Sequence, residues 1–160
     1  MDFTPGTFNF VNGAHPGTRV QTTLAKQLAL NVVLFSPLQM ASDMIENYEN
    51  QPAFSFITSC PTTWAKTVVP DAKLGEYVVI ARKDRRSENW FIGCITNEKE
   101  RTIKVPLDFL DNGSAYKATL YCDGDNADYL TNPYPVVISE RKRNPFLALY
   151  VFEERRRGGN

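Results

Sequence analysis

The sequence predicts a mainly β chain, an antiparallel β-sandwich preceded by an N-terminal helical segment. Three observations support this. The 160 residues suffice for one ordinary domain. Short strand-like runs separated by turn residues follow one another from about residue 53 to the end, without helices between them. Residues 21–49 instead carry apolar side chains at helical spacing.

The helical segment is apolar on nearly every side. Leu24, Leu28 and Val32 share one stripe, and Lys26 is the only charge in its first half. A helix of this kind belongs between two layers of protein. Residues 36–39, with serine before proline and glutamine after, predict that the helix kinks or restarts there.

The β part is predicted from runs that alternate apolar and polar residues or are rich in β-branched and aromatic ones. A short apolar piece at residues 53–57 fits either a helix or a strand. The expected strands are residues 77–81, 90–95, 102–105, 116–122, 135–138 and 146–152.

Charge and cysteine usage exclude several classes of protein. Lys+Arg and Asp+Glu both number 18, so the chain lacks the basic excess of most nucleic-acid-binding domains. The basic clusters at residues 82–86, 141–143 and 155–157 are expected to be solvated strand ends. Three cysteines without a CxxC motif predict no disulfide framework and no zinc site, and we expect three free thiols, at Cys60, Cys94 and Cys122.

No catalytic or metal-binding set emerges from the residues. His15 is the only histidine and lies between glycines and prolines, as expected of an exposed loop. The acidic run at residues 123–128 lacks the ligand spacing of a calcium loop and predicts a polar connection. A glycosidase needs two facing carboxyl groups. Only Asp2 lies at the possible end of a strand, so no catalytic residue is assigned.

A resemblance to a known family is carried by residues 1–6, 21–30, 36–41, 61–64, 79–83, 90–93 and 116–119. In these segments the chain resembles glycoside hydrolase family 97, which contains α-glucosidases and α-galactosidases.

This resemblance implies that residues 1–52 are the last strand and helix of a (β/α)8 barrel. Residues 53–160 would form the C-terminal β-sandwich, with its final strand missing. Asp2, Phe3 and Thr4 would lie near the catalytic end of the barrel as possible pocket-lining residues. The catalytic carboxyls and calcium ligands of the longer enzyme would lie upstream, so no cofactor is expected in this chain.

The expected function is therefore that of a non-catalytic C-terminal fragment, with a structural and oligomerisation role in an enzyme that hydrolyses α-glycosidic bonds. The fragment alone is expected to be inactive, to self-associate through its apolar helix and an open sheet edge near Phe152, and to meet α-linked oligosaccharides only through the longer enzyme. The alternative is a carbohydrate-binding β-sandwich in which Trp64, Trp90 and tyrosines stack on sugar rings.

Neither a nucleic acid nor a membrane is expected as a partner. Residues 27–42 are too short and too polar for a membrane span. The first residues show no secretory signal, although the resemblance implies a periplasmic or secreted location for the longer enzyme.

Overall fold

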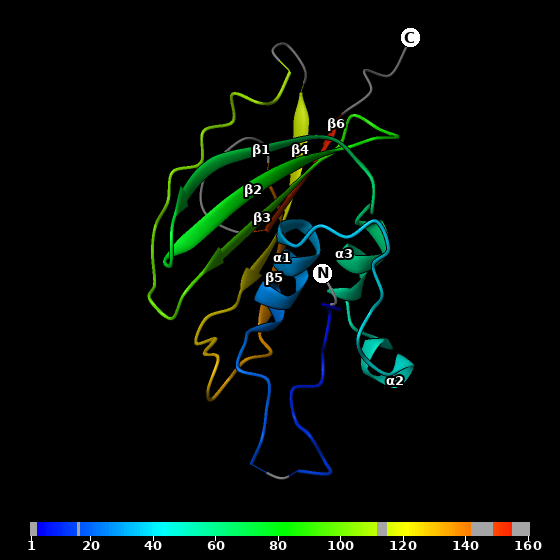
Figure 1. Cartoon of the computed structure of the whole chain (residues 1–160), viewed down its shortest axis with the longest axis vertical. Coiled ribbons are helices and arrows are strands. Elements are labelled where there is room, and N and C mark those ends of the chain that lie inside the picture. Colours follow the sequence, from blue (N-terminus) through cyan, green and yellow to red (C-terminus); the bar gives the residue numbers. More distant parts are fainter. Residues whose placement is uncertain (1–2, 16, 112–114, 142–148, 155–160) are drawn as a thin grey trace.

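The computed structural model describes residues 3–15, 17–111, 115–141 and 149–154. Within these residues the chain forms three short helices followed by six strands (Figure 1). The helices are α1 (Leu24–Val33), α2 (Ile45–Tyr48) and α3 (Phe54–Ser59), and the strands are β1 (Trp64–Lys73), β2 (Tyr77–Asp84), β3 (Trp90–Thr96), β4 (Tyr116–Asp123), β5 (Val136–Arg141) and β6 (Leu149–Glu154).

The strands form one hydrogen-bonded sheet in the order β1-β2-β3-β6-β4-β5, and every neighbouring pair is antiparallel. The mainly β, antiparallel prediction is confirmed. The predicted open edge near Phe152 is wrong, because β6 lies between β3 and β4: Phe152 is opposite Trp90 on one side and Ala118 on the other. Within the described residues, the edges of the sheet are β1 and β5.

Strand β1 was not predicted from the sequence. It is an edge strand whose side chains are exposed or half-buried, so it lacks the apolar alternation that marked the other strands. The register with β2 shifts between Val68 and Asp71, where Pro70 lies. Proline cannot donate to a ladder hydrogen bond, so it is tolerated at an edge or a bulge.

Helix α1 lies across one face of the sheet, mainly on β3 (Figure 1). Thr23 is its N-cap, and the Thr23 hydroxyl accepts a hydrogen bond from the Lys26 N–H at 3.3 Å. The close approach depends on Gly93. A Cβ at this position would lie 2.9 Å from the Ala29 carbonyl oxygen and 3.0 Å from the Val32 Cβ.

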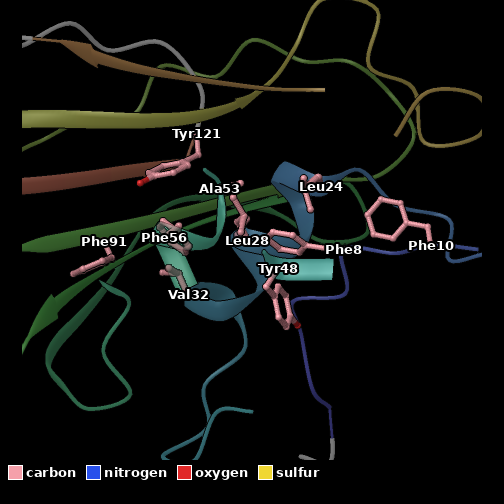
Figure 2. Close-up of a cluster of buried hydrophobic side chains, with 11 residues drawn as sticks. Phe8, Phe10, Leu24, Leu28, Val32, Tyr48, Ala53, Phe56, Phe91 and Tyr121 are labelled. Carbon is pink, nitrogen blue, oxygen red and sulfur yellow. The ribbon is translucent and has the colours of Figure 1, made fainter. Parts of the chain in front are cut away.

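The core on this face encloses α1 from both sides (Figure 2). Leu28 and Val32 are fully buried, with Phe91 and Tyr121 of the sheet in the same cluster. Phe56 of α3 packs edge-on against both of these rings. The prediction that α1 belongs between two layers is confirmed, whereas the prediction that its apolar surface needs a second copy of the chain is wrong, since other parts of the chain cover it.

The opposite face of the sheet buries a second cluster that includes Ala81, Ile92 and Leu120. Ile103 and Val105 cover this cluster from an extended segment. Residues 102–105 therefore alternate as predicted, but they are not a strand, because none of them joins a described ladder. Ile103 and Val105 are buried against the sheet.

The predicted restart of the helix at residues 36–39 is wrong. Helix α1 ends at Val33, residues 34–44 contain no helix, and α2 begins at Ile45. The Ser36 hydroxyl does accept a hydrogen bond from the Leu38 N–H, at 3.3 Å. However, no described part of the chain covers Leu38, so the apolar contacts that stabilise a helix in a protein are missing. The ambiguous piece at residues 53–57 contributes to α3.

Candidate functional site

The predicted pocket-lining residues lie at the start of the chain. Asp2 is outside the described residues. Phe3 is exposed and Thr4 half-buried, and both lie in extended backbone. Exposure alone does not assign Phe3 or Thr4 to a pocket, so their role stays a prediction.

The loop that follows them is fixed to residues 43–48 by hydrogen bonds. Gly6 has a positive φ of 94°, which glycine adopts readily. The Gly6 N–H donates to the Gln27 side-chain oxygen at 3.2 Å, and the Tyr48 hydroxyl donates to the Gly6 carbonyl oxygen at 2.7 Å. The same hydroxyl accepts from the Asp43 N–H at 2.9 Å. Tyr48 thus joins the first loop to the segment after α1.

Asp43 completes this connection. One of its carboxylate oxygens accepts from the N–H groups of Phe8 at 2.7 Å and Asn9 at 2.6 Å. The other accepts from Met44 N–H at 2.8 Å and from the Asn47 side-chain amide at 2.6 Å. Partial burial alone would raise the pKa of Asp43, but the four hydrogen-bond donors together lower it by more. The pKa of Asp43 therefore lies below the ordinary value of 3.8. The only local signal for this role is the Ser42–Asp43 pair before the short helix α2.

Arg82 joins α1 to the sheet. Its Nε donates to the Val32 carbonyl oxygen at 2.6 Å and its Nη2 to the Val33 carbonyl oxygen at 3.4 Å. These carbonyls belong to the last residues of α1, and a cation at this C-terminal end also complements the helix dipole. The guanidinium lies 5.6 Å from the centre of the Phe35 ring and 5.9 Å from that of Trp64. Arg82 is only 8% exposed, so the prediction that its cluster is a solvated strand end is wrong for this residue.

The prediction of solvated strand ends is not tested for the basic clusters at residues 141–143 and 155–157. Residues 142–143 and 155–157 lie outside the described residues, and only the backbone of Arg141 is described. The acidic run at residues 123–128 is a polar connection, as predicted. Asp128 fixes its far end by accepting from the N–H groups of Leu130 at 2.9 Å and Thr131 at 2.8 Å.

The most conspicuous surface feature is an apolar segment between α1 and α2. Five large side chains within residues 35–45 are exposed by 54–74%. A surface of this kind is typical of an interface with another protein or domain. We call it the 35–45 segment, and its exposed side chains are those of Phe35, Leu38, Met40, Met44 and Ile45.

A shallow groove of about 340 Å³ lies beside the first loop. It combines amide and carboxylate side chains with two aromatic rings, a combination suited to hydroxyl groups and sugar rings. Tyr134 stacks on Phe10 with ring centres 5.1 Å apart. The groove is lined by Phe8, Asn9, Leu24, Glu46, Asn47, Gln51 and Tyr134.

The tryptophans of the alternative sugar site do not share an exposed face. Trp90 is 2% exposed and packs against Phe109 on one face of the sheet. Trp64 is half-buried and lies edge-on to Phe91, in the core on the other face. Neither the ring of Trp90 nor a Trp64–Trp90 pair is therefore available to stack on a sugar.

The described residues hold no group of three or more His, Cys, Asp or Glu side chains that could bind a metal ion. No disulfide joins the cysteines, and burial raises the pKa of both Cys60 and Cys94 to about 12. Of the helices in the described part of the chain, none is long and apolar enough to cross a membrane.

The relatives of this chain are consistent with this architecture. A "Retaining alpha-galactosidase" from Bacteroides thetaiotaomicron is 42% identical over 122 residues, which are 72% of this chain and 18% of that protein. A "Probable retaining alpha-galactosidase" from Streptomyces bingchenggensis is 32% identical over 108 residues, or 67% of this chain and 16% of that protein. The chain thus spans less than a fifth of the length of either relative.

Solved structures extend the match to the N-terminal residues. A glycoside hydrolase family 97 enzyme from Pseudoalteromonas sp. strain K8, solved in complexes with panose and with acarbose, has a TM-score of 0.87 and 42% identity. The match covers 96% of this chain and 26% of that one. A β-arabinopyranosidase at 23% identity and a TM-score of 0.73 shares the fold.

The family model described as "Glycosyl-hydrolase 97 C-terminal, oligomerisation" matches residues 63–159, which contain all six strands. This match covers more than half of the chain and agrees with the relatives and the solved structures. The chain therefore belongs to glycoside hydrolase family 97, of which it contains the C-terminal oligomerisation domain.

Proposed function

We propose that this chain serves as the non-catalytic C-terminal segment of a larger enzyme that hydrolyses α-glycosidic bonds. The observation that carries the proposal is the extent of the structural match, which takes in 96% of this chain but only 26% of the Pseudoalteromonas enzyme. Residues 1–52 would complete the last strand and helix of the catalytic barrel, and residues 53–160 would form the C-terminal β-sandwich beside it.

The 35–45 segment supports a contact with the rest of such an enzyme. Burying a large apolar side chain contributes about 1.5–3 kcal/mol, so five exposed ones leave a substantial free energy available to a partner surface. Arg82 and Phe35 hold the start of the segment beside the end of α1. The remainder of the barrel is the partner that we propose for it.

Asp2, Phe3 and Thr4 would then lie near the sugar pocket of the larger enzyme, as residues that shape the pocket rather than react. Calcium, which the family resemblance implies for that enzyme, would be held by residues outside this chain.

Complementation tests the proposal directly. A family 97 enzyme truncated just before the segment that matches residue 1 should be inactive alone, and this chain alone should match a buffer blank on nitrophenyl α-glucoside and α-galactoside. Mixing the two should restore hydrolysis. A Leu38→Asp, Ile45→Asp double variant should fail to restore it, whereas Leu74→Asp, a fully exposed position on the loop between β1 and β2, should succeed.

Two results would contradict the proposal. One is hydrolysis by this chain alone that survives repurification and disappears in Asp2→Ala. The other is complementation that is as efficient with the Leu38→Asp, Ile45→Asp variant as with the wild type. The latter would show that the 35–45 segment is not the contact with the barrel.

Self-association is the second part of the proposed function. The description of the matched family model as an oligomerisation domain supports it. Helix α1 is a poor candidate for this contact, because most of its apolar side chains are already buried within the chain. Light scattering over a range of concentrations should detect the association, and a mass that stays monomeric up to millimolar protein would exclude it.

A carbohydrate-binding function remains the alternative, and the groove beside Tyr134 is the observation that favours it. Asn9, Asn47 and Gln51 could hydrogen-bond sugar hydroxyls there, with the tyrosine ring against a sugar face. Titration with maltose and galactose oligosaccharides should give a saturable signal that is lost in Tyr134→Ala. Absence of a signal at millimolar oligosaccharide would remove this alternative.

A further inference from the structure

The two edges of the sheet differ in how well they resist pairing with another strand. An unpaired strand edge offers a row of N–H and C=O groups, and proteins protect such edges with proline, bulges and lysine. Edge strand β1 has all three: Pro70, a register shift between Val68 and Asp71, and exposed Lys66 and Lys73.

Edge strand β5 lacks this protection in its first half. It contains no proline, and its six pairs with β4 run without a register shift. Val137 is 50% exposed and Ile138 39% exposed, on opposite faces of the strand. Among the described residues, β4 is the only strand that pairs with β5.

The charge of Glu140, the one acidic residue of β5, is also paired with an opposite charge within the chain. The Glu140 carboxylate lies 2.5 Å from the Lys117 ammonium on β4. Like charges that face each other across a strand pair disfavour the pairing. Because Lys117 offsets the charge of Glu140, this carboxylate gives the edge little protection against an identical strand.

From these observations we propose that two copies of this chain associate through their β5 edges, antiparallel and about a two-fold axis. The two six-stranded sheets then form one continuous sheet, with Val137 and Ile138 of each copy next to the partner strand. A two-fold axis uses the same surface on both copies, so the assembly closes as a dimer. This inference rests on the self-association part of the proposed function and assigns a surface to it.

The length of β5 sets the strength of the contact. Specific interfaces bury at least about 1,000 Å² in total, and a six-residue strand edge supplies only part of this. The loop that joins β4 to β5 adds exposed Leu130 and Tyr134 next to the start of the strand. Arg19 holds this loop by donating to the carbonyl oxygens of Leu130 and Tyr129. We therefore expect a dissociation constant in the micromolar range.

Sedimentation equilibrium on matched variants tests this assignment. Val137→Lys and Ile138→Lys each add a charge that must face the partner strand, so each should weaken dimerisation at least tenfold. Val69→Lys is the control, since Val69 is similarly exposed on the other edge strand, and it should leave the dissociation constant unchanged. Leu38→Lys should also leave it unchanged, because the 35–45 segment is assigned to the barrel.

Hydrogen exchange on the wild type gives a readout that does not depend on whether a variant folds. The amides of β5 should gain protection as the protein concentration rises, and those of β1 should not. A gain of protection confined to β1 or to residues 35–45 would overturn the assignment.

The outcomes distinguish the assignment from the function on which it rests. A wild type that stays monomeric refutes self-association as a whole. A wild type that dimerises, together with folded β5 variants that dimerise equally well, refutes only the role of β5. Loss of dimerisation in Leu38→Lys or Val69→Lys alone would also refute it, by placing the contact on another surface.

Discussion

Replacing Gly93 by alanine tests the closest contact between α1 and the sheet. By strand preference alone the change should stabilise the protein, since glycine inside a strand is unfavourable by about 0.5–1 kcal/mol relative to alanine. The structure gives the opposite expectation. The added Cβ would lie 2.9 Å from the Ala29 carbonyl oxygen and 3.0 Å from side-chain carbons of Val32 and Val33.

The magnitude follows from what would have to move. The Ala29 oxygen belongs to the helix backbone, so rotation of a side chain cannot relieve this contact. Helix α1 would have to shift, although Leu28 and Val32 on it are fully buried. Inserting a methyl group into a well-packed core costs about 1–3 kcal/mol, which corresponds to about a 5- to 150-fold rise in the unfolded fraction.

Urea unfolding followed by circular dichroism measures this change in the free energy of unfolding. Gly13→Ala is the matched control, because a Cβ at Gly13 would meet no atom within 4 Å. It should leave the stability unchanged or raise it slightly. If Gly93→Ala is as stable as the wild type or more stable, then α1 does not lie in close contact with β3 at Gly93.

Three further predictions concern single side chains. Arg82→Met should lower the free energy of unfolding by about 1.5–3 kcal/mol in urea unfolding, because it removes charged hydrogen bonds to the end of α1. Arg85→Met is the control: the side chain of Arg85 makes a weak, exposed contact, so the change should be less than about 0.5 kcal/mol. Equal effects of the two substitutions would contradict the capping role of Arg82. The folded-state pKa of Asp43 lies below its unfolded value near 3.8, so the stabilisation by its carboxylate is fully present above that value and is lost as the pH falls through the folded pKa. In urea unfolding from pH 7 to pH 2.5, the wild type should therefore be more stable than Asp43→Asn, and this difference should shrink only at the acid end. A difference that stays constant over this range would refute the prediction. Because the pKa values of Cys60 and Cys94 are raised to about 12, both thiols should resist iodoacetamide at pH 8 in the folded protein and react after denaturation, when mass spectrometry should count three modified cysteines.

Much of the sheet could be predicted from the sequence, because its central strands carry strong local signals. Strands β2, β3 and β4 are β-branched or alternating runs bounded by turn residues, and the structure has them where the pattern predicted them. The edge strand β1 has no such signal, since its side chains are exposed or only half-buried. Its position depends on pairing with β2, a non-local contact that a sequence window cannot report.

The contacts that fix the N-terminal part were less accessible to sequence reasoning. Arg82 lies in a run of charged residues, and only the sheet register places it on the helix-facing side next to the carbonyls of α1. The Asp43 carboxylate accepts hydrogen bonds from Asn9 and Phe8, which precede it in the chain by 34 and 35 positions. Such roles depend on tertiary distance rather than on local pattern, so an isolated charge in the sequence did not reveal them.

The position of α1 has a consequence for how the two proposed parts of the chain behave. The boundary near residue 52 separates a barrel segment from a sandwich by family resemblance, but α1 shares one core with Phe91 and Tyr121 of the sheet. Arg82 and Gly93 join the same elements through hydrogen bonds and close packing. We therefore expect residues 1–52 to unfold together with the sheet, while the 35–45 segment remains exposed for a partner. On the proposed assignment, one face of the sheet supports the last helix of a barrel, while its β5 edge, at the opposite end of the strand order from β1, is available to a second copy.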